Sequence, residues 1–251
     1  MSTSPASQPI WARPEPGARR PRFSREQIAT AALAIADAEG FDAVSIRRVA
    51  AELGAGTMSL YRYISAKSEL VALMDDAIMG ETLIPDGQLP AGWREALAMI
   101  ARATRAALLR HPWAVQSLQG RGAAAQDGPF GPNGIRHFEQ SLAAVASAPL
   151  PTAAQLDLLA IVDDYVFGHV MRAGEMQARA AAASADPGHA AAITEYLQGL
   201  LSTGRYPHLG KLARDPAAQS LADPDTLGER FERGLQALLD GALADDPPSS
   251  R

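Results

Sequence analysis

The amino-acid sequence predicts an all-α fold, and three observations support this prediction. Apolar residues recur at three- and four-residue spacing in every long segment, which is the periodicity of a helix packed on one face. No segment shows the period-two alternation of a half-buried strand. Serine, threonine or aspartate precedes several of these segments, and glycine or proline follows many of them, as expected at helix ends.

The first predicted helix runs from Arg25 to about Glu39. Ser24 is suited to cap it, and Gly40 is suited to end it. Its packing stripe consists of Ile28, Ala32, Leu33, Ile35 and Ala36. We expect Phe41 and Val44 to fill the core between this helix and the next two.

Residues 44–67 are predicted to form two short helices joined by a tight turn. Ser45 can cap the first of these helices, and Gly54 follows its apolar face where a left-handed residue would end it. Thr57 can cap the second helix, in which Leu60, Tyr61 and Ile64 recur at helical spacing. Two helices with a short glycine-containing turn form a helix-turn-helix, whose second helix lies in the major groove of DNA. A small helical hairpin with no role in DNA binding is the alternative.

The rest of the chain is predicted to be helical as well. The expected helices cover residues 69–79, 93–110, 113–118, 135–146, 152–176, 189–202 and 225–244, and the helix from 152 is allowed to reach 183. Gly80 is expected to end the first of them, and the segment 120–134 is expected to be a loop. The helix from Thr152 is apolar on more than one face, and the last helix carries an apolar stripe from Leu227 to Ala242. These faces pack either within one subunit or against a second one.

Composition and charge limit the possible functions. The net charge is −5, but residues 18–67 carry +3 and residues 68–251 carry −8, so the basic charge is concentrated where a DNA contact would need it. There is no cysteine, which fits a reducing cytoplasm, and no stretch reaches the ~18 apolar residues of a membrane span. Familiar catalytic motifs are missing, and the five histidines share no metal-ligand spacing, so we expect no enzyme activity, metal or cofactor.

The run from Ser24 to Met79 resembles the N-terminal domain of TetR-type transcriptional regulators. The matching segments are IATAALAIADAEGFDAVSIRRVAAELG, TMSLYRYI and AKSELV, and the second of them is most similar to the branch related to the tetracycline repressor. The resemblance implies a three-helix helix-turn-helix domain followed by a helical effector-binding and dimerisation domain. We expect a basic, proline-rich, disordered tail over 1–22, the DNA-binding domain over 23–67, a connecting helix over 68–80, the effector and dimer domain over 81–246, and a frayed end over 247–251.

The resemblance also implies which residues meet DNA. The expected contacts are Arg47, Thr57, Met58, Ser59, Tyr61, Tyr63 and Lys67. Arg47 matches a base-reading position, and guanidinium can bind guanine O6 and N7 together, although an ion pair with Glu52 or Asp42 is the alternative. Lys67 matches a phosphate-binding lysine at a helix N-terminus. Of the two tyrosines, Tyr61 is expected to be the more buried.

The implied function is a cytoplasmic, homodimeric regulator that binds double-stranded operator DNA and answers to a small-molecule effector. A repressor acting on a palindromic operator is the expected form. Candidates for the effector pocket, on the helices after the connecting one, are Trp113, Phe138, Tyr165 and His169. The alternatives are a small-molecule-binding helical protein without DNA affinity and a helical enzyme. The sequence identifies neither the effector nor the operator, and it does not separate repressor from activator.

Overall fold

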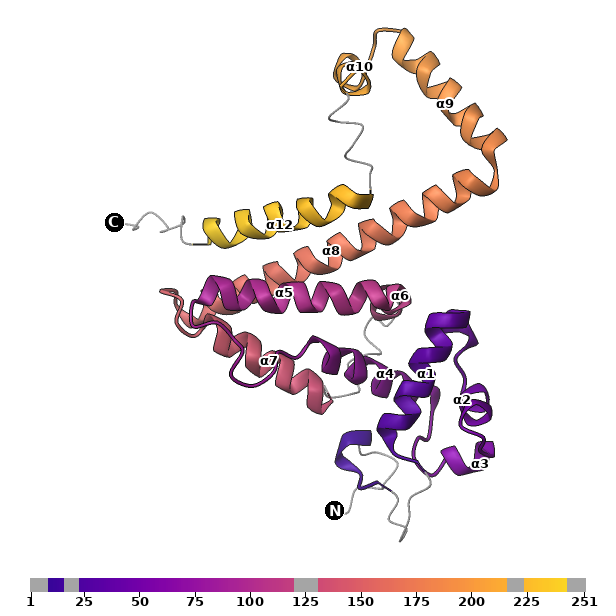
Figure 1. Ribbon diagram of the computed structural model, residues 1–251, viewed down its shortest axis with the longest axis vertical. Coiled ribbons are helices and arrows are strands. Elements are labelled where there is room, and N and C mark those ends of the chain that lie inside the picture. The colour runs from indigo at the N-terminus through magenta and orange to yellow at the C-terminus, as the bar shows by residue number, and fades with distance from the viewer. Residues whose placement is uncertain (1–8, 16–22, 120–130, 216–223, 243–251) are drawn as a thin grey trace. The chain divides into compact units, whose positions relative to one another are not determined.

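The computed structural model describes residues 9–15, 23–119, 131–215 and 224–242, and the predicted all-α fold is confirmed, since no described residue lies in a strand (Figure 1). The helices up to the connecting helix are η2 (Ile10–Ala12), α1 (Arg25–Glu39), η3 (Phe41–Ala43), α2 (Ile46–Glu52), α3 (Thr57–Leu60) and α4 (Lys67–Thr82). They are followed by α5 (Trp93–Arg110), α6 (Pro112–Gln119), α7 (Pro132–Val145), α8 (Thr152–Ala185), α9 (Pro187–Ser202), α10 (Pro207–Ala213) and α12 (Pro224–Gly241).

The chain divides into two compact units within α8. The N-terminal unit is Met1–Val166, and the C-terminal unit is Phe167–Arg251. In the N-terminal unit α4 is central, because α1 packs against it and so do α5 and α7. Part of the core between α5 and α7 is formed by Ile84, Ala96, Ile100 and Ala144. Among the described helices, none is both long enough and apolar enough to cross a lipid bilayer.

The first helix begins and ends as predicted. Gln27 donates from its backbone N–H to Ser24 Oγ at 3.1 Å, and Ser24 donates from its own N–H to Gln27 Oε1 at 2.9 Å. Two backbone N–H groups that have no partner within the helix are satisfied in this way. Gly40 ends the helix with a φ of 87°, a backbone conformation that side-chain-bearing residues rarely adopt. The predicted stripe of α1 is buried, with Ile28 and Ala32 completely inaccessible.

The helix α4 continues past Gly80, which was predicted to end it. A Cβ atom at Gly80 would lie 3.0 Å from Asn133 Nδ2, so this glycine allows α7 to approach α4 closely rather than ending the helix. Beyond it, Thr82 Oγ1 lies 2.7 Å from His137 Nδ1, and Gln140 bonds both the N–H and the C=O of Ile84. The C-terminal end of α4 and the residues that follow it are therefore hydrogen-bonded to α7.

Proline is the first residue of several helices, and at Pro132 and Pro207 it begins a helix inside a segment that was predicted to be a loop. Pro112, Pro132, Pro187, Pro207 and Pro224 are each the first residue of a helix. Proline is tolerated at that position because its missing N–H would have had no partner within the helix. The consequence is that α7 starts inside the segment that was expected to be a loop, and that α10 was not predicted at all.

The tail was expected to be disordered over residues 1–22, but residues 9–15 are folded onto the N-terminal unit. Ile10 is buried at 3% exposure, and Arg13 Nη2 lies 2.5 Å from Glu69 Oε1 of α4. Arg25 of α1 donates to the Arg13 carbonyl at 2.9 Å and, from its backbone N–H, to Glu15 at 3.1 Å. Burial of Ile10, the ion pair between Arg13 and Glu69 and the hydrogen bonds from Arg25 therefore hold this segment in place. The remainder of the expected tail and residues 247–251 lie outside the described residues.

Candidate nucleic-acid interface

The turn between α2 and α3 is formed by local hydrogen bonds at residues that the sequence predicted to cap and end α2. Ser45 Oγ accepts the N–H of Arg48 at 3.1 Å and so caps α2. At the other end, Gly54 adopts a φ of 60°, its N–H bonds the Ala51 carbonyl at 3.1 Å, and the N–H of Ala55 bonds the Ala50 carbonyl at 2.8 Å. This pair of bonds is the Schellman arrangement, which reverses the chain direction immediately after a helix.

The second helix of the pair is shorter than predicted. Gly56, not Thr57, is the residue that precedes α3, and no side chain caps the helix. The helix α3 ends at Leu60, and the N–H groups of Tyr63 and Ile64 both bond the Leu60 carbonyl, at 2.8 and 3.0 Å. Leu60 and Ile64 are fully buried and anchor this short segment to the core.

The segment presents two large side chains to solvent and withdraws a third. Met58 is 78% exposed and Tyr61 is 48% exposed, whereas Tyr63 is only 7% exposed. The prediction that Tyr61 is the more buried tyrosine is therefore wrong. Tyr63 lies three residues after buried Leu60 and next to buried Ile64, so it shares the buried side of this segment. Thr57 and Ser59 are half-buried at the same surface.

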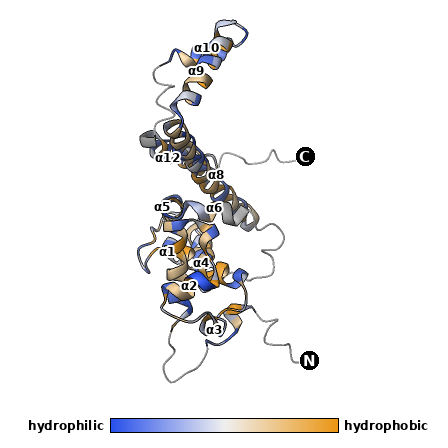
Figure 2. Ribbon diagram, turned by 90° about the vertical axis from the view of Figure 1, so that its right-hand side faces the viewer, coloured by the Kyte–Doolittle hydropathy of each residue, from blue (hydrophilic) through white to orange (hydrophobic). Residues whose placement is uncertain are grey.

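Two neighbouring arginines on α2 have different surroundings. Arg48 donates from Nη2 to Glu39 at 2.7 Å and from Nη1 to Glu52 at 2.8 Å. These hydrogen bonds raise the pKa of Arg48, and the bond to Glu39 has the larger effect. Arg47 is exposed and forms no ion pair with any residue that the structure describes. The ion pair with Glu52 that was considered for Arg47 is thus made by Arg48. In Figure 2, where the ribbon is coloured by residue hydropathy, part of α2 is blue.

Lys67 is the first residue of α4, as expected. Its side chain is exposed, and its Nζ lies 5.3 Å from the centroid of the Phe41 ring. The free N–H groups of the first helical turn and the lysine charge lie together, which is a favourable environment for a phosphate group. Arg62, which follows Tyr61, is also exposed and without an ion pair among the described residues, so it adds a cation to the same region.

The four effector candidates lie in different surroundings. Trp113 donates from Nε1 to Asp37 of α1 at 2.7 Å and stacks on Phe41, so it lies at a contact with the predicted DNA-binding domain. Phe138 on α7 is 49% exposed, and Tyr165 on α8 is half-buried. In the C-terminal unit the His169 ring lies 5.0 Å from that of Phe231. The structure does not bring these four residues together around one described cavity.

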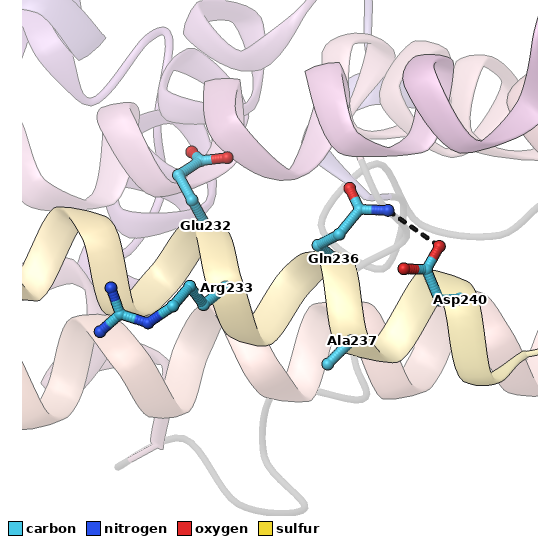
Figure 3. A pocket seen from close by; sticks show the side chains of 5 residues that line it. All are labelled: Glu232, Arg233, Gln236, Ala237 and Asp240. Carbon is cyan, nitrogen blue, oxygen red and sulfur yellow. Dashed lines mark hydrogen bonds between the residues drawn. The ribbon is translucent and has the colours of Figure 1, made fainter.

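The apolar stripe of α12 is only partly covered within one chain. Phe231, Leu235 and Leu239 are at most 1% exposed, whereas Leu227, Leu238 and Ala242 of the same stripe are half-buried. The outward side of α12 is polar: Figure 3 shows a hollow lined by Glu232, Arg233, Gln236, Ala237 and Asp240. On α8, in contrast, Leu156 is 43% exposed and Ile161 is 49% exposed.

Comparison with known proteins assigns the chain to a family. Residues 28–74 match "Bacterial regulatory proteins, tetR family", and residues 85–245 match "Tetracyclin repressor-like, C-terminal domain". The HTH-type transcriptional repressor DrrR1 of Streptomyces coeruleorubidus is 35% identical over 223 residues, which cover 88% of this chain and 78% of that protein.

Solved structures show the same relationship. Apo ActR from Streptomyces coelicolor is 30% identical with a TM-score of 0.66, and the match covers 90% of this chain and 97% of ActR. ActR in complex with actinorhodin is 28% identical with a TM-score of 0.61, covering 88% of this chain and 97% of ActR. The chain therefore belongs to the tetR family of bacterial regulatory proteins and is a DNA-binding transcriptional regulator, not an enzyme.

Proposed function

We propose that the chain is a cytoplasmic repressor that binds a palindromic operator as a homodimer and releases it when a small-molecule effector binds. The observation that carries the proposal is Arg47, an exposed guanidinium without an ion pair among the described residues, on the helix before α3. A guanidinium that makes no internal ion pair is available for guanine O6 and N7, whereas Arg48 beside it is already bound to two carboxylates. The DNA-binding domain is proposed to cover 23–67, with 68–80 connecting it to the effector and dimer domain over 81–246.

The proposed roles follow from exposure and charge. Met58 is apolar and exposed, so it is suited to contact a thymine methyl group or a sugar. Tyr61 offers an exposed phenol, and the half-buried Thr57 and Ser59 offer hydroxyl groups for phosphates or base edges. Lys67 is assigned to a phosphate. Tyr63 is withdrawn from this set, because its buried ring supports the segment from within.

Relatives support an effector and repression. The relative DrrR1 is described as a transcriptional repressor, and ActR has been crystallised with actinorhodin and with (S)-DNPA. By extension, we propose a small-molecule effector here, with Phe138, Tyr165 and His169 retained as candidate contacts. For the dimer we propose that α8 contributes Leu156 and Ile161, since exposed large apolar side chains on a helix favour burial against another surface.

The matched pair of arginines gives the test. We would measure binding of the chain to a labelled duplex from its own upstream DNA, and to variants with single base changes, at several salt concentrations. Arg47→Ala should weaken binding by ~1–3 kcal/mol per half-site and relax the preference at one base pair of each half-site. Lys67→Ala should weaken all sequences alike and lower the log–log salt slope by about 1 per half-site.

Arg48→Ala is the control, because this arginine is engaged by Glu39 and Glu52 within the protein. It should leave base preference unchanged. If Arg47→Ala and Arg48→Ala weaken every duplex to the same extent, Arg47 does not read a base. If the unchanged protein binds no upstream sequence better than unrelated DNA, the proposed operator function fails altogether.

A further inference from the structure

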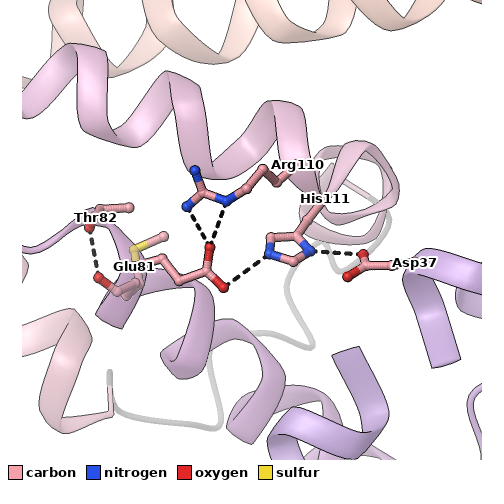
Figure 4. Close-up of polar contacts among 6 residues, drawn as sticks. Asp37, Glu81, Thr82, Arg110 and His111 are labelled. Carbon is pink, nitrogen blue, oxygen red and sulfur yellow. Dashed lines mark hydrogen bonds and ion pairs between the residues drawn. The ribbon is translucent and has the colours of Figure 1, made fainter. Parts of the chain in front are cut away.

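A second polar cluster lies outside the proposed DNA interface and joins α1 and α4 to the corner between α5 and α6. His111 ends α5 and is only 6% exposed. Its Nδ1 lies 2.8 Å from Asp37 Oδ1 of α1, and its Nε2 lies 3.1 Å from Glu81 Oε1 of α4 (Figure 4). One buried imidazole thus bridges the first helix of the DNA-binding domain and the connecting helix.

The two contacts of this imidazole together require two N–H donors. A neutral ring has one N–H and one lone pair, so it can donate to only one of two carboxylates. Both distances are hydrogen-bond distances, and both carboxylates are acceptors, so both contacts form only with the imidazolium. Arg110 donates to Glu81 Oε2 from Nε at 3.1 Å and from Nη2 at 2.6 Å. With His111 protonated, these two cations and two carboxylates are balanced; without the proton, a lone pair faces a carboxylate and the cluster is negative.

A half-buried histidine in the same unit, His137, has the opposite environment. Thr82 Oγ1 lies 2.7 Å from Met79 O, and a carbonyl can only accept, so the hydroxyl hydrogen is directed there. His137 Nδ1, at 2.7 Å from the same hydroxyl oxygen, must therefore be the donor. No carboxylate is bonded to this ring among the described residues, and burial lowers the pKa of His137. The charged partners on both sides are what distinguish His111.

The bridge is connected to the proposed phosphate contact through two aromatic rings. Trp113 donates from Nε1 to the same Asp37 Oδ1 at 2.7 Å. Its ring is stacked on Phe41 with 5.5 Å between centroids, and the Phe41 ring lies under Lys67 Nζ. A chain of neighbouring side chains therefore joins His111 to Lys67.

We propose that His111 is a positioning residue for DNA binding: its imidazolium holds α1 and α4 against the α5–α6 corner, so operator affinity depends on a proton bound outside the DNA interface. The proposal rests on the proposed operator function. A DNA-binding domain that is already held in one orientation loses less conformational entropy when both domains of a dimer engage their half-sites. The bridged state should therefore bind the operator more tightly. Loss of this proton should therefore weaken operator binding.

The test compares the unchanged protein with His111→Gln in operator binding by fluorescence anisotropy, from about pH 6 to about pH 8.5 at constant ionic strength. Glutamine bonds one carboxylate and does not titrate. At about pH 6 the variant should bind roughly tenfold more weakly, and at about pH 8.5 the two proteins should agree within about twofold. His189→Gln is the matched control: this exposed histidine of α9 should leave the pH profile unchanged.

A second measurement needs no DNA. Because His111 lies 6.0 Å from Trp113, its charge should quench the indole, and Trp113 emission should rise with pH in a protein whose Trp11 and Trp93 are replaced by phenylalanine. This titration should vanish in His111→Gln. If that variant does not fold, Asp37→Asn carries the test, since it keeps an acceptor oxygen but removes one charge and should reduce both pH effects.

The outcomes separate the two proposals. An affinity ratio between the unchanged protein and His111→Gln that stays constant with pH, or a variant that binds more tightly, would overturn the role of His111 alone. Absence of sequence-specific binding by the unchanged protein at every pH would refute the operator function, and this role of His111 with it. In that case, the Trp113 titration would still report whether the bridge forms.

Discussion

Asp76 offers a sharp test of how α4 is attached to α7. Its Oδ1 accepts the backbone N–H groups of Asn133 and Gly134, both at 2.9 Å, and its Oδ2 accepts the Asn133 side-chain amide at 3.1 Å. These are the second and third residues of α7, whose N–H groups have no partner within their own helix. A carboxylate on one helix therefore caps the N-terminus of another and lies at the positive end of its dipole.

The expected cost depends on which part of the side chain is removed. Asp76→Ala leaves the N–H of buried Gly134 without a partner, and that of half-buried Asn133 with water as its best replacement. At ~1–3 kcal/mol for each stranded donor, the free energy of unfolding should fall by about 3 kcal/mol. Asp76→Asn keeps an acceptor oxygen for both backbone N–H groups but replaces the Oδ2 acceptor of the Asn133 amide with a donor, so it should cost about 1 kcal/mol.

Urea unfolding followed by tryptophan fluorescence is the appropriate assay, because Trp11, Trp93 and Trp113 all lie in the N-terminal unit with Asp76. Protein concentration must be fixed, since dimerisation contributes to apparent stability. Asp86→Ala is the control: Asp86 also reaches α7, through Arg136 at 3.4 Å, but it is exposed, so its loss should cost under ~0.5 kcal/mol. Equal costs for Asp76→Asn and Asp76→Ala, or a cost of Asp76→Ala as small as the control, would refute the reasoning.

The pH dependence of the same pair has a defined sign. Burial raises the pKa of Asp76, although its hydrogen bonds with Gly134 and Asn133 oppose the shift. A raised pKa means that the folded state holds the proton more tightly than the unfolded state does. The stability of the unchanged protein relative to Asp76→Asn should therefore increase as pH falls from the folded-state pKa to the ordinary aspartate value, and level off below it. A relative loss of stability in that range would show that the hydrogen bonds outweigh burial.

Two further predictions concern the dimer and the tyrosines. Leu156→Glu with Ile161→Glu should produce monomers with little operator affinity, measured by sedimentation, because a charge would be placed on the exposed apolar side of α8; a dimeric double variant would exclude this surface. A matched change at the buried Leu235 should instead destabilise the folded chain. Tyr61→Ala should weaken DNA binding with little loss of stability, whereas Tyr63→Ala should lower the free energy of unfolding by ~3–5 kcal/mol. Denaturation and a binding titration on both variants measure these effects, and the reverse pattern would contradict the prediction.

Features set by neighbouring residues could be predicted from the sequence. The Ser24 and Ser45 caps and the reversal at Gly54 depend on groups within a few positions, and all three were predicted correctly. Proline was harder to interpret, because the same residue ends one helix or begins another. At Pro132 and Pro207 only the residues that follow decide between these outcomes, and here the chain after each proline forms a helix.

Features set by long-range packing were not accessible to sequence reasoning. Gly80 could be interpreted as a helix end until Asn133, 53 positions later, is seen packed against it. The burial of Tyr63 is different, because this residue lies three positions after buried Leu60 and next to buried Ile64, so helical spacing alone already indicated it. The bridge at His111 joins residues 37, 81 and 111, which no local motif relates to one another.

The contacts of α4 restrict how an effector could act on the DNA-binding residues. This helix begins at Lys67 beside the proposed phosphate contact and ends at Thr82, which is bonded to α7. Between these points Asp76 caps α7, and Glu81 binds both Arg110 and His111. A single unbroken helix transmits displacement along its axis, because its backbone hydrogen bonds resist bending. A change in the α5–α7 region that displaces α4 would have to rearrange these bonds, and each of them has a titratable or replaceable side chain through which such a coupling can be measured.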